Sequence, residues 1–163
     1  DMDYECLEAF DTLLYGHSCC MGMEPALHAS SQNRPYIVGN ALMASIPGHT
    51  YFKAIIEDVF KEGNPAQPEN KTKYLYIMET TGPFMTTRLY DARSSKEEIT
   101  LLSAELVAPL NGPEVGKVLN GVETEELDDK IKKAFAVHYF FGSWLPQTAN
   151  NSSSPTISKT LQT

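Results

Sequence analysis

The chain has 163 residues, of which 42% are hydrophobic and 21% are charged, a composition typical of one globular domain with its own core. Its formal net charge is −8 at pH 7 and no cluster of lysines and arginines is present, so no nucleic-acid partner is expected. No uncharged apolar run approaches the roughly 18 residues that a membrane-spanning helix needs.

The first third of the chain predicts short, alternating strands and helices. Residues 1–6 resemble the end of a strand, and residues 7–14 carry apolar side chains at the spacing of a short helix. Residues 18–23 form an apolar run typical of a buried strand. The polar segment 24–35 ends at a proline and predicts a loop, and residues 36–45 predict a second strand.

The clearest helix is expected after Thr50, which suits an N-cap, with Gly63 at the position where the helix would stop. The segment that follows, residues 73–80, is rich in β-forming side chains and predicts a strand. Pro83 then suits the first turn of another helix.

The last third of the chain predicts little regular structure. Residues 99–110 favour a strand, although two overlapping Ser-x-x-Glu patterns before them leave a helix as the minority alternative. Residues 110–130 are acidic and predict a loop, and residues 134–144 predict a final strand-like segment. The alternation as a whole predicts an α/β fold, with one domain over residues 1–145 and a polar, disordered tail over residues 146–163.

Asp1 and Asp3 are the first candidates for chemistry. Residues two apart on an extended strand point to the same side, and two facing carboxylates suit a hard divalent cation such as Mg²⁺ or Mn²⁺. On its own, however, so short a pattern more often marks two solvated surface acids.

His138 stands alone in an apolar strand and is open to two interpretations. It is either a hydrogen-bonded core residue or a third metal ligand, and Ser143 and Trp144 nearby could contribute a hydroxyl donor and an aromatic wall. The other three histidines are expected at the surface: they are His17, His28 and His49.

Two further positions could contact a ligand. Gly82 lies in a Thr-Gly-Pro turn that leads into a helix, which indicates either a simple helix start or a backbone that presents N–H groups to an anion. Asn40 interrupts an apolar strand, and a buried amide there needs partners, one of which could be a ligand hydroxyl.

In chain order, "DMDYECL", "GNALMASIPGHTYF", "TTGP" and "AVHYFFGSW" resemble the glycosyltransferases whose sugar-binding region contains the DXD motif. That family includes the yeast initiating α-1,6-mannosyltransferase and many bacterial enzymes of capsular polysaccharide and lipopolysaccharide biosynthesis. The resemblance covers about residues 1 to 145. It implies the C-terminal portion of a GT-A fold, a mixed sheet flanked by helices, with the nucleotide-binding first half expected before Asp1.

The resemblance also implies roles for individual residues. Asp1, Asp3 and His138 would hold Mn²⁺ or Mg²⁺. Five residues would bind the nucleotide-sugar donor, and one of them, Asp1, would also bind the metal. They are Asp1, Asn40, Gly82, Ser143 and Trp144. No catalytic residue is assigned.

The function expected from this resemblance is a divalent-metal-dependent, retaining hexosyltransferase that moves a sugar from a nucleotide-sugar donor to a glycan or glycolipid acceptor. Two alternatives stay open: a truncated or non-catalytic carbohydrate- or nucleotide-sugar-binding module, and a metal-dependent phosphohydrolase. The odd number of cysteines favours free thiols in a reducing compartment. A cytoplasmic location is therefore expected, with peripheral association at the inner face of a bacterial membrane, or the Golgi lumen if the protein is eukaryotic.

Overall fold

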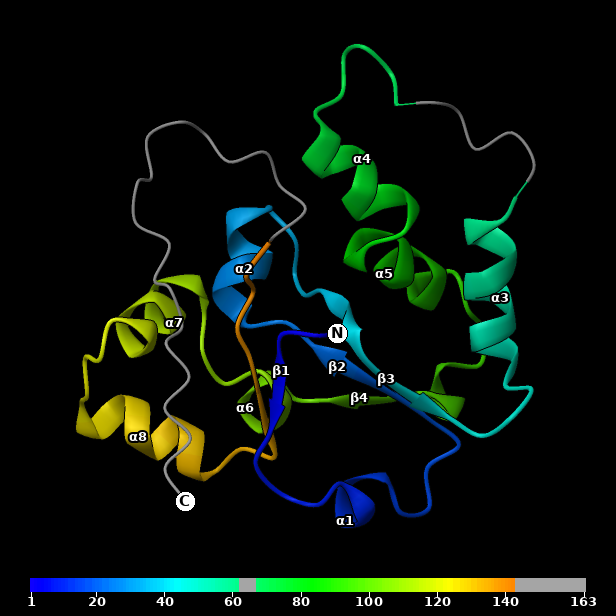
Figure 1. The fold of residues 1–163 in the computed structure, drawn as a ribbon. Coiled ribbons are helices and arrows are strands. Elements are labelled where there is room, and N and C mark those ends of the chain that lie inside the picture. Colours follow the sequence, from blue (N-terminus) through cyan, green and yellow to red (C-terminus); the bar gives the residue numbers. More distant parts are fainter. Residues whose placement is uncertain (62–66, 143–163) are drawn as a thin grey trace.

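The computed structural model describes residues 1–61 and 67–142, in which short strands and helices alternate around a small mixed sheet (Figure 1). The strands are β1 (Tyr4–Cys6), β2 (Cys19–Met23), β3 (Val38–Ser45), β4 (Thr100–Leu102) and β5 (Ala136–His138). The helices are α1 (Asp11–Leu14), α2 (Ala26–Ser31), α3 (Thr50–Val59), α4 (Lys73–Thr80), α5 (Pro83–Asp91), the short 3-10 helix η1 (Lys96–Glu98), α6 (Ala104–Val107), α7 (Gly112–Leu119) and α8 (Glu125–Lys132). The predicted α/β class is thus confirmed at this level.

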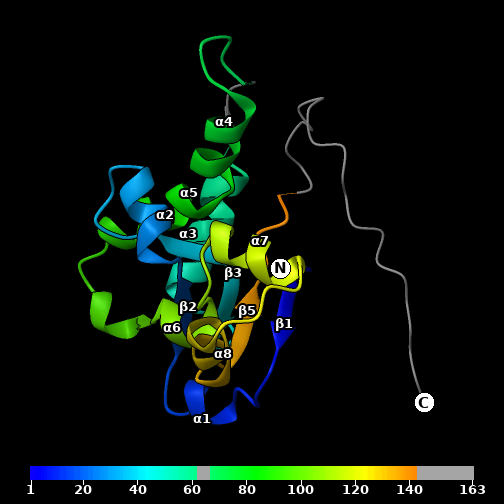
Figure 2. The same ribbon diagram turned by 90° about the vertical axis from the view of Figure 1, so that its left-hand side faces the viewer.

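The central sheet has the strand order β3-β2-β4, in which β2 runs antiparallel to β3 and parallel to β4. Successive side chains of β2 point to opposite faces. Cys19 and Met21 pack in one core with side chains of α3 and α5, whereas Cys20 packs in another with side chains of α1 and α6. The sheet is therefore covered by helices on both faces, as Figures 1 and 2 show.

A separate two-stranded ribbon joins the two ends of the described chain. β1 pairs antiparallel with β5, so that Tyr4 lies opposite His138. The ribbon is covered by α7 and α8, since Val137 packs with Leu127 and Val115. This pairing fixes where the residues before Tyr4 lie relative to His138.

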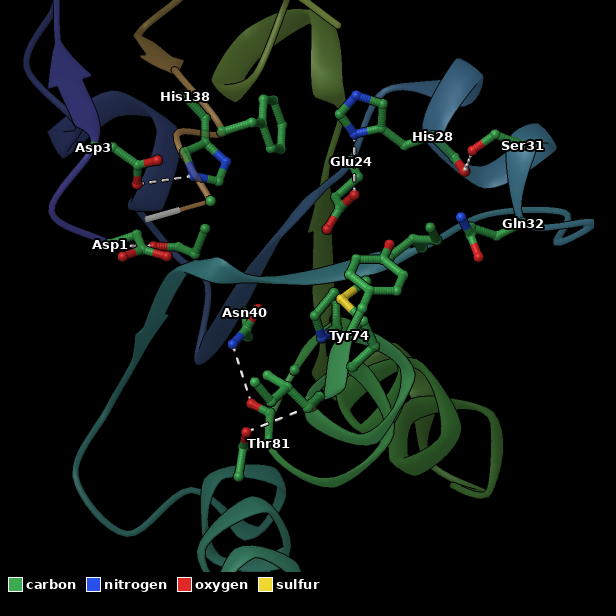
Figure 3. A pocket seen from close by; sticks show the side chains of 18 residues that line it. Asp1, Asp3, Glu24, His28, Ser31, Gln32, Asn40, Tyr74, Thr81 and His138 are labelled. Carbon is green, nitrogen blue, oxygen red and sulfur yellow. Dashed lines mark hydrogen bonds and ion pairs between the residues drawn. The ribbon is translucent and has the colours of Figure 1, made fainter. Parts of the chain in front are cut away.

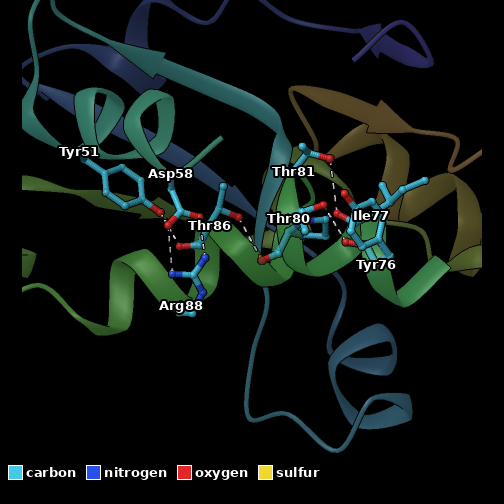
Figure 4. A network of polar contacts seen from close by, with 9 residues as sticks. Tyr51, Asp58, Tyr76, Ile77, Thr80, Thr81, Thr86 and Arg88 are labelled. Carbon is cyan, nitrogen blue, oxygen red and sulfur yellow. Dashed lines mark hydrogen bonds and ion pairs between the residues drawn. The ribbon is translucent and has the colours of Figure 1, made fainter. Parts of the chain in front are cut away.

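Buried hydroxyl groups attach α5 to the sheet. The Thr86 hydroxyl donates to the carbonyl oxygen of Val38 (2.6 Å), and the Val38 N–H donates to the Thr87 hydroxyl (2.9 Å). The Tyr51 hydroxyl of α3 donates to the carbonyl oxygen of Thr86 (2.7 Å), as Figure 4 shows. These bonds hold the start of α5, and the turn before it, at one position beside β3.

Three expectations for the backbone were wrong. Residues 24–35 contain α2, which begins directly after Pro25. Residues 73–80 form α4 and no strand, because Tyr74, Ile77 and Met78 recur at helical spacing and the Thr72 side chain caps the Leu75 N–H.

The acidic segment 110–130, expected as a loop, forms two helices. Asn111 and Glu114 make a capping box that starts α7. Thr124 caps α8, whose Leu127 is buried. Of residues 99–110, only Thr100–Leu102 form the expected strand, and α6 follows directly.

Other expectations were met or nearly met. Pro83 is the first residue of α5, as predicted. His49, and not Thr50, is the N-cap of α3, and its ring nitrogen accepts from the Tyr51 N–H (3.2 Å).

Gly63 and the expected tail lie outside the described residues. Over residues 1–61 and 67–142, no helix is both long and apolar enough to cross a bilayer.

Candidate functional site

The β1–β5 ribbon brings Asp3 and His138 together, although they lie 135 positions apart in the chain. Asp3 precedes β1 directly and His138 ends β5. Asp3 Oδ1 lies 3.1 Å from His138 Nε2, and Asp3 Oδ2 accepts from the Phe141 N–H (2.8 Å). Both side chains are largely shielded from solvent, with 16% of Asp3 and 10% of His138 exposed.

Asp1 completes a cluster of three candidate ligands. One ligand atom each from Asp1, Asp3 and His138 lies within 4.8 Å of the other two. The Asp1 carboxylate is exposed, and its Oδ1 accepts from the Met2 N–H (2.9 Å). The backbone nitrogen of Asp1 donates to the carbonyl oxygen of Ala41 in β3 (2.6 Å), which ties Asp1 to the central sheet.

The His138 ring is held between two aromatic side chains. Tyr4 stacks on it at a centroid distance of 4.8 Å and an interplanar angle of 12°, and Phe140 lies 4.0 Å away at 44°. Burial lowers the pKa of His138, although the carboxylates of Asp3 and Glu24 act in the opposite direction. The lowered pKa favours the neutral ring, the form in which imidazole binds a metal.

The geometry of this cluster fits a small divalent cation. Mg²⁺ lies about 2.0–2.1 Å from its oxygen ligands, so ligands on opposite sides of it are about 4 Å apart. Ligands at right angles on such an ion are about 2.9 Å apart, and the three candidate atoms lie within 4.8 Å of one another, so they would have to move closer together to bind one ion. Two carboxylates and one imidazole are also a donor set that suits Mn²⁺.

The cluster lies at one side of a pocket of about 360 Å³, shown in Figure 3. Volumes of about 300–1,000 Å³ are typical of small-molecule sites. The pocket is also lined by Asn40 and Gly82, so the structure brings together the five described residues that the sequence singled out for metal and donor. Ser143 and Trp144 lie outside the described residues.

Asn40 and Gly82 line the pocket, and one N–H donor of each is already used in a hydrogen bond within the protein. Asn40 Nδ2 donates to the carbonyl oxygen of Thr81 (3.2 Å), which links β3 to the turn between α4 and α5. The Gly82 N–H donates to the carbonyl oxygen of Ile77 (2.8 Å), so it is directed into the end of α4. The Thr-Gly-Pro turn could be a simple helix start or a backbone site for an anion. Because the Gly82 N–H is already bonded inside the protein, this bond favours the simple helix start.

Sequence reasoning missed Glu24 and His28, which also line the pocket. Glu24 follows β2, and His28 lies on α2, one helical turn later. His28 Nδ1 lies 3.2 Å from Glu24 Oε2, and His28 Nε2 accepts from the Gly112 N–H (3.2 Å). The expectation that His28 is a surface residue was wrong, since 79% of its side chain is covered. Glu24 lies before α2, so the pair depends on how the chain turns from β2 into that helix, which no local pattern in the sequence shows.

The outcome differs for the two remaining histidines. His17 is exposed, as expected, and its Nδ1 lies 2.8 Å from the Thr100 hydroxyl. His49 is buried, so its assignment to the surface was wrong; its ring is needed inside the protein as the cap of α3.

The charges around the pocket are unbalanced. Its lining includes three carboxylates, from Asp1, Asp3 and Glu24, whereas none of the described lining residues is a lysine or arginine. An anionic ligand would therefore be repelled unless a cation accompanied it.

Comparisons with models of known protein families, with curated protein sequences and with solved structures found no significant match for this chain.

Proposed function

We propose that this chain is the metal- and donor-binding portion of a glycosyltransferase, which moves a hexose from a nucleotide-sugar donor to a glycan or glycolipid acceptor. The observation that carries the proposal is the convergence of Asp1, Asp3 and His138 at one side of a ligand-sized pocket. A GT-A fold, a retaining outcome and a role in polysaccharide or lipopolysaccharide synthesis belong to the same proposal and rest on the sequence resemblance.

The charge of the pocket supports a metal-dependent reaction on a diphosphate. The described lining offers carboxylates and no lysine or arginine side chain, so these lining side chains do not neutralise a diphosphate group. A divalent ion held by Asp1, Asp3 and His138 would supply that positive charge and stabilise the departing nucleoside diphosphate.

The chain's own residues then have distinct tasks. Asp3 and His138 provide preorganised ligand atoms, because the Phe141 N–H and the rings of Tyr4 and Phe140 hold them. Asn40 fixes the turn at the opposite wall, and the apolar side chains of the pocket exclude water from the bond that breaks.

The first prediction concerns metal binding. Titration of the chain with Mn²⁺, followed by the loss of the electron paramagnetic resonance signal of free Mn²⁺, should show one site. Asp3→Asn and His138→Ala should each weaken binding by at least about tenfold, because loss of even an outer-shell partner typically costs 10- to 100-fold. Asp11→Asn and His17→Ala, which alter exposed residues outside the pocket, serve as matched controls.

Turnover separates the candidate functions. With Mn²⁺ and a panel of nucleotide sugars, a glycosyltransferase should release nucleoside diphosphate faster when its acceptor is present, and Asp3→Asn should abolish the release. Metal and donor binding without release would identify a non-catalytic binding module. Release that no acceptor accelerates would identify a hydrolase. Unchanged Mn²⁺ affinity in both variants would refute the metal site.

A further inference from the structure

We propose that Glu24, positioned by His28, is the specificity-determining residue of the pocket. Its carboxylate would recognise the transferred sugar by accepting hydrogen bonds from the hydroxyl groups of that sugar. The part of the pocket around Glu24 would then take a neutral hexose. This inference rests on the proposed function, since it names the sugar-recognising group of the same pocket.

Glu24 stands at a central place in the fold. It follows β2, the middle strand of the sheet, and its N–H donates to the carbonyl oxygen of Ile37 (3.1 Å). Ligands of α/β proteins commonly bind beyond the carboxyl ends of the strands, where this residue lies. In Figure 3 its carboxylate lies between His28 and Asn40, and one of its oxygens is directed away from His28 into the pocket.

His28 fixes the orientation of this carboxylate. Because His28 Nε2 accepts the Gly112 N–H, a neutral His28 carries its hydrogen on Nδ1 and donates it to Glu24 Oε2. Phe140 packs against the His28 ring, edge to face, at 4.5 Å. The Glu24 carboxylate is thus held in one position, with 17% of its side chain exposed.

The surroundings of Glu24 match a sugar better than a charged ligand. A carboxylate oriented in this way accepts hydrogen bonds from neighbouring hydroxyl groups. The amides of Gln32 and Asn40 offer both donors and acceptors, and Ile37 and Met78 form apolar walls for the C–H faces of a ring. With three carboxylates and no lysine or arginine in the described lining, an acidic sugar is disfavoured.

Glu24 shares the pocket with residues of both of its walls. Burial and, after it, the charge of Glu24 raise the pKa of Tyr74 on α4. His138 lines the opposite wall of the same pocket, so a ligand that fills the pocket would contact the Glu24 carboxylate.

The test measures hexose binding without metal or nucleotide. Saturation-transfer difference NMR on the full 163-residue chain would use the methyl glycosides of glucose, galactose and mannose as probes. At least one should bind, and Glu24→Gln should weaken its binding by about tenfold or more, since hydrogen bonds to a charged group are lost. Glu57→Gln, an exposed glutamate on α3 outside the pocket, is the matched control.

Two more variants test the positioning role of His28. His28→Phe removes both hydrogen bonds and should weaken hexose binding about as much as Glu24→Gln does. His28→Gln keeps one donor and one acceptor and should restore most of it. A purely structural role would give the same loss of folded protein in both variants, which circular dichroism would detect.

Four outcomes decide the matter. The inference is overturned if no hexose binds, if Glu24→Gln binds hexose as the wild type does, or if glucosamine binds but neutral hexoses do not, which would indicate a site for organic cations. Mn²⁺ titration of the same samples tests the proposed function separately, because it measures the metal site and not the sugar site. Glu24-dependent hexose binding without any Mn²⁺ site would keep the sugar assignment and refute the metal-dependent transferase.

Discussion

At the scale of single residues, Gly82 shows how closely the pocket wall is packed. A Cβ atom at this position would lie 2.8 Å from Met78 Cα and 3.0 Å from the carbonyl oxygen of Ile77. Both are backbone atoms of α4, so they cannot move aside without shifting the helix. Gly82 therefore allows α4 and α5 to meet at the turn that Asn40 contacts.

Gly82→Ala should lower the free energy of unfolding by about 1–3 kcal/mol, because the added methyl group forces the backbone of α4 to move. Urea denaturation would measure the loss. Gly116→Ala on α7 is the matched control, since a Cβ there meets nothing within 4 Å. The control should be neutral or stabilising by up to about 1 kcal/mol. Equal effects at the two positions would contradict the close approach at Gly82.

At the scale of elements, α7 depends on a network of three side chains at its start. Glu114 closes the capping box with Asn111 and also pairs with Lys130 of α8. Burial alone would raise the pKa of Glu114, but the bonds from Lys130 and from the Asn111 N–H outweigh it and lower the pKa. The ionised carboxylate is thus the stabilising form.

Because the pKa of Glu114 is lower in the folded chain than in the unfolded chain, its contribution is present above the unfolded pKa and is lost as the pH falls through the folded value. Glu114→Gln should therefore lower the free energy of unfolding by about 1–2 kcal/mol at pH 7. The difference from the wild type should shrink as the pH falls below about 4. Denaturation at several pH values, with Glu57→Gln as control, would measure it; a pH-independent difference would contradict the ion pair.

The same elements explain how far the sequence predicted the fold and the site. Apolar runs predicted β2 and β3 correctly, because β2 is buried along almost its whole length and neither strand contains a charged residue. The helices α2, α7 and α8 were missed because they are short and each buries only one residue: Ala29, Val115 and Leu127. Capping residues indicated α7 and α8 better than hydrophobicity did.

The candidate site, like the fold, was predicted in part and missed in part. Asp3 and His138 were selected by residue type, and their meeting depends on the register of β1 with β5, which no local pattern contains. Glu24 was missed because its significance comes from His28 on a helix that was expected to be a loop. Candidate residue types can thus be selected from sequence, but the pairing of the distant strands that brings them together requires the folded structure.

At the scale of the whole molecule, the candidate metal ligands connect the two ends of the described chain. A ligand that binds only the folded state stabilises it by about 2.7 kcal/mol at a concentration 100 times its Kd. Saturating Mn²⁺ should accordingly raise the Tm by roughly 5–10 °C, at about 2–4 °C per kcal/mol for a chain of this size. Differential scanning fluorimetry would measure the shift.

Two controls accompany that experiment. Asp3→Asn should lose the shift, whereas His17→Ala should keep it. An equal shift in Asp3→Asn would show that Mn²⁺ stabilises the protein at some other place.

The pairing of β1 with β5 has a consequence for how the protein is made. Asp3 leaves the ribosome 135 residues ahead of His138. During most of synthesis Asp1 and Asp3 therefore have no imidazole partner, and Tyr4 has no strand to pair with. Any product that stops before Ala136 retains the acidic pair but not the site, so the capacity to bind Mn²⁺ would distinguish a chain translated through β5 from every shorter one.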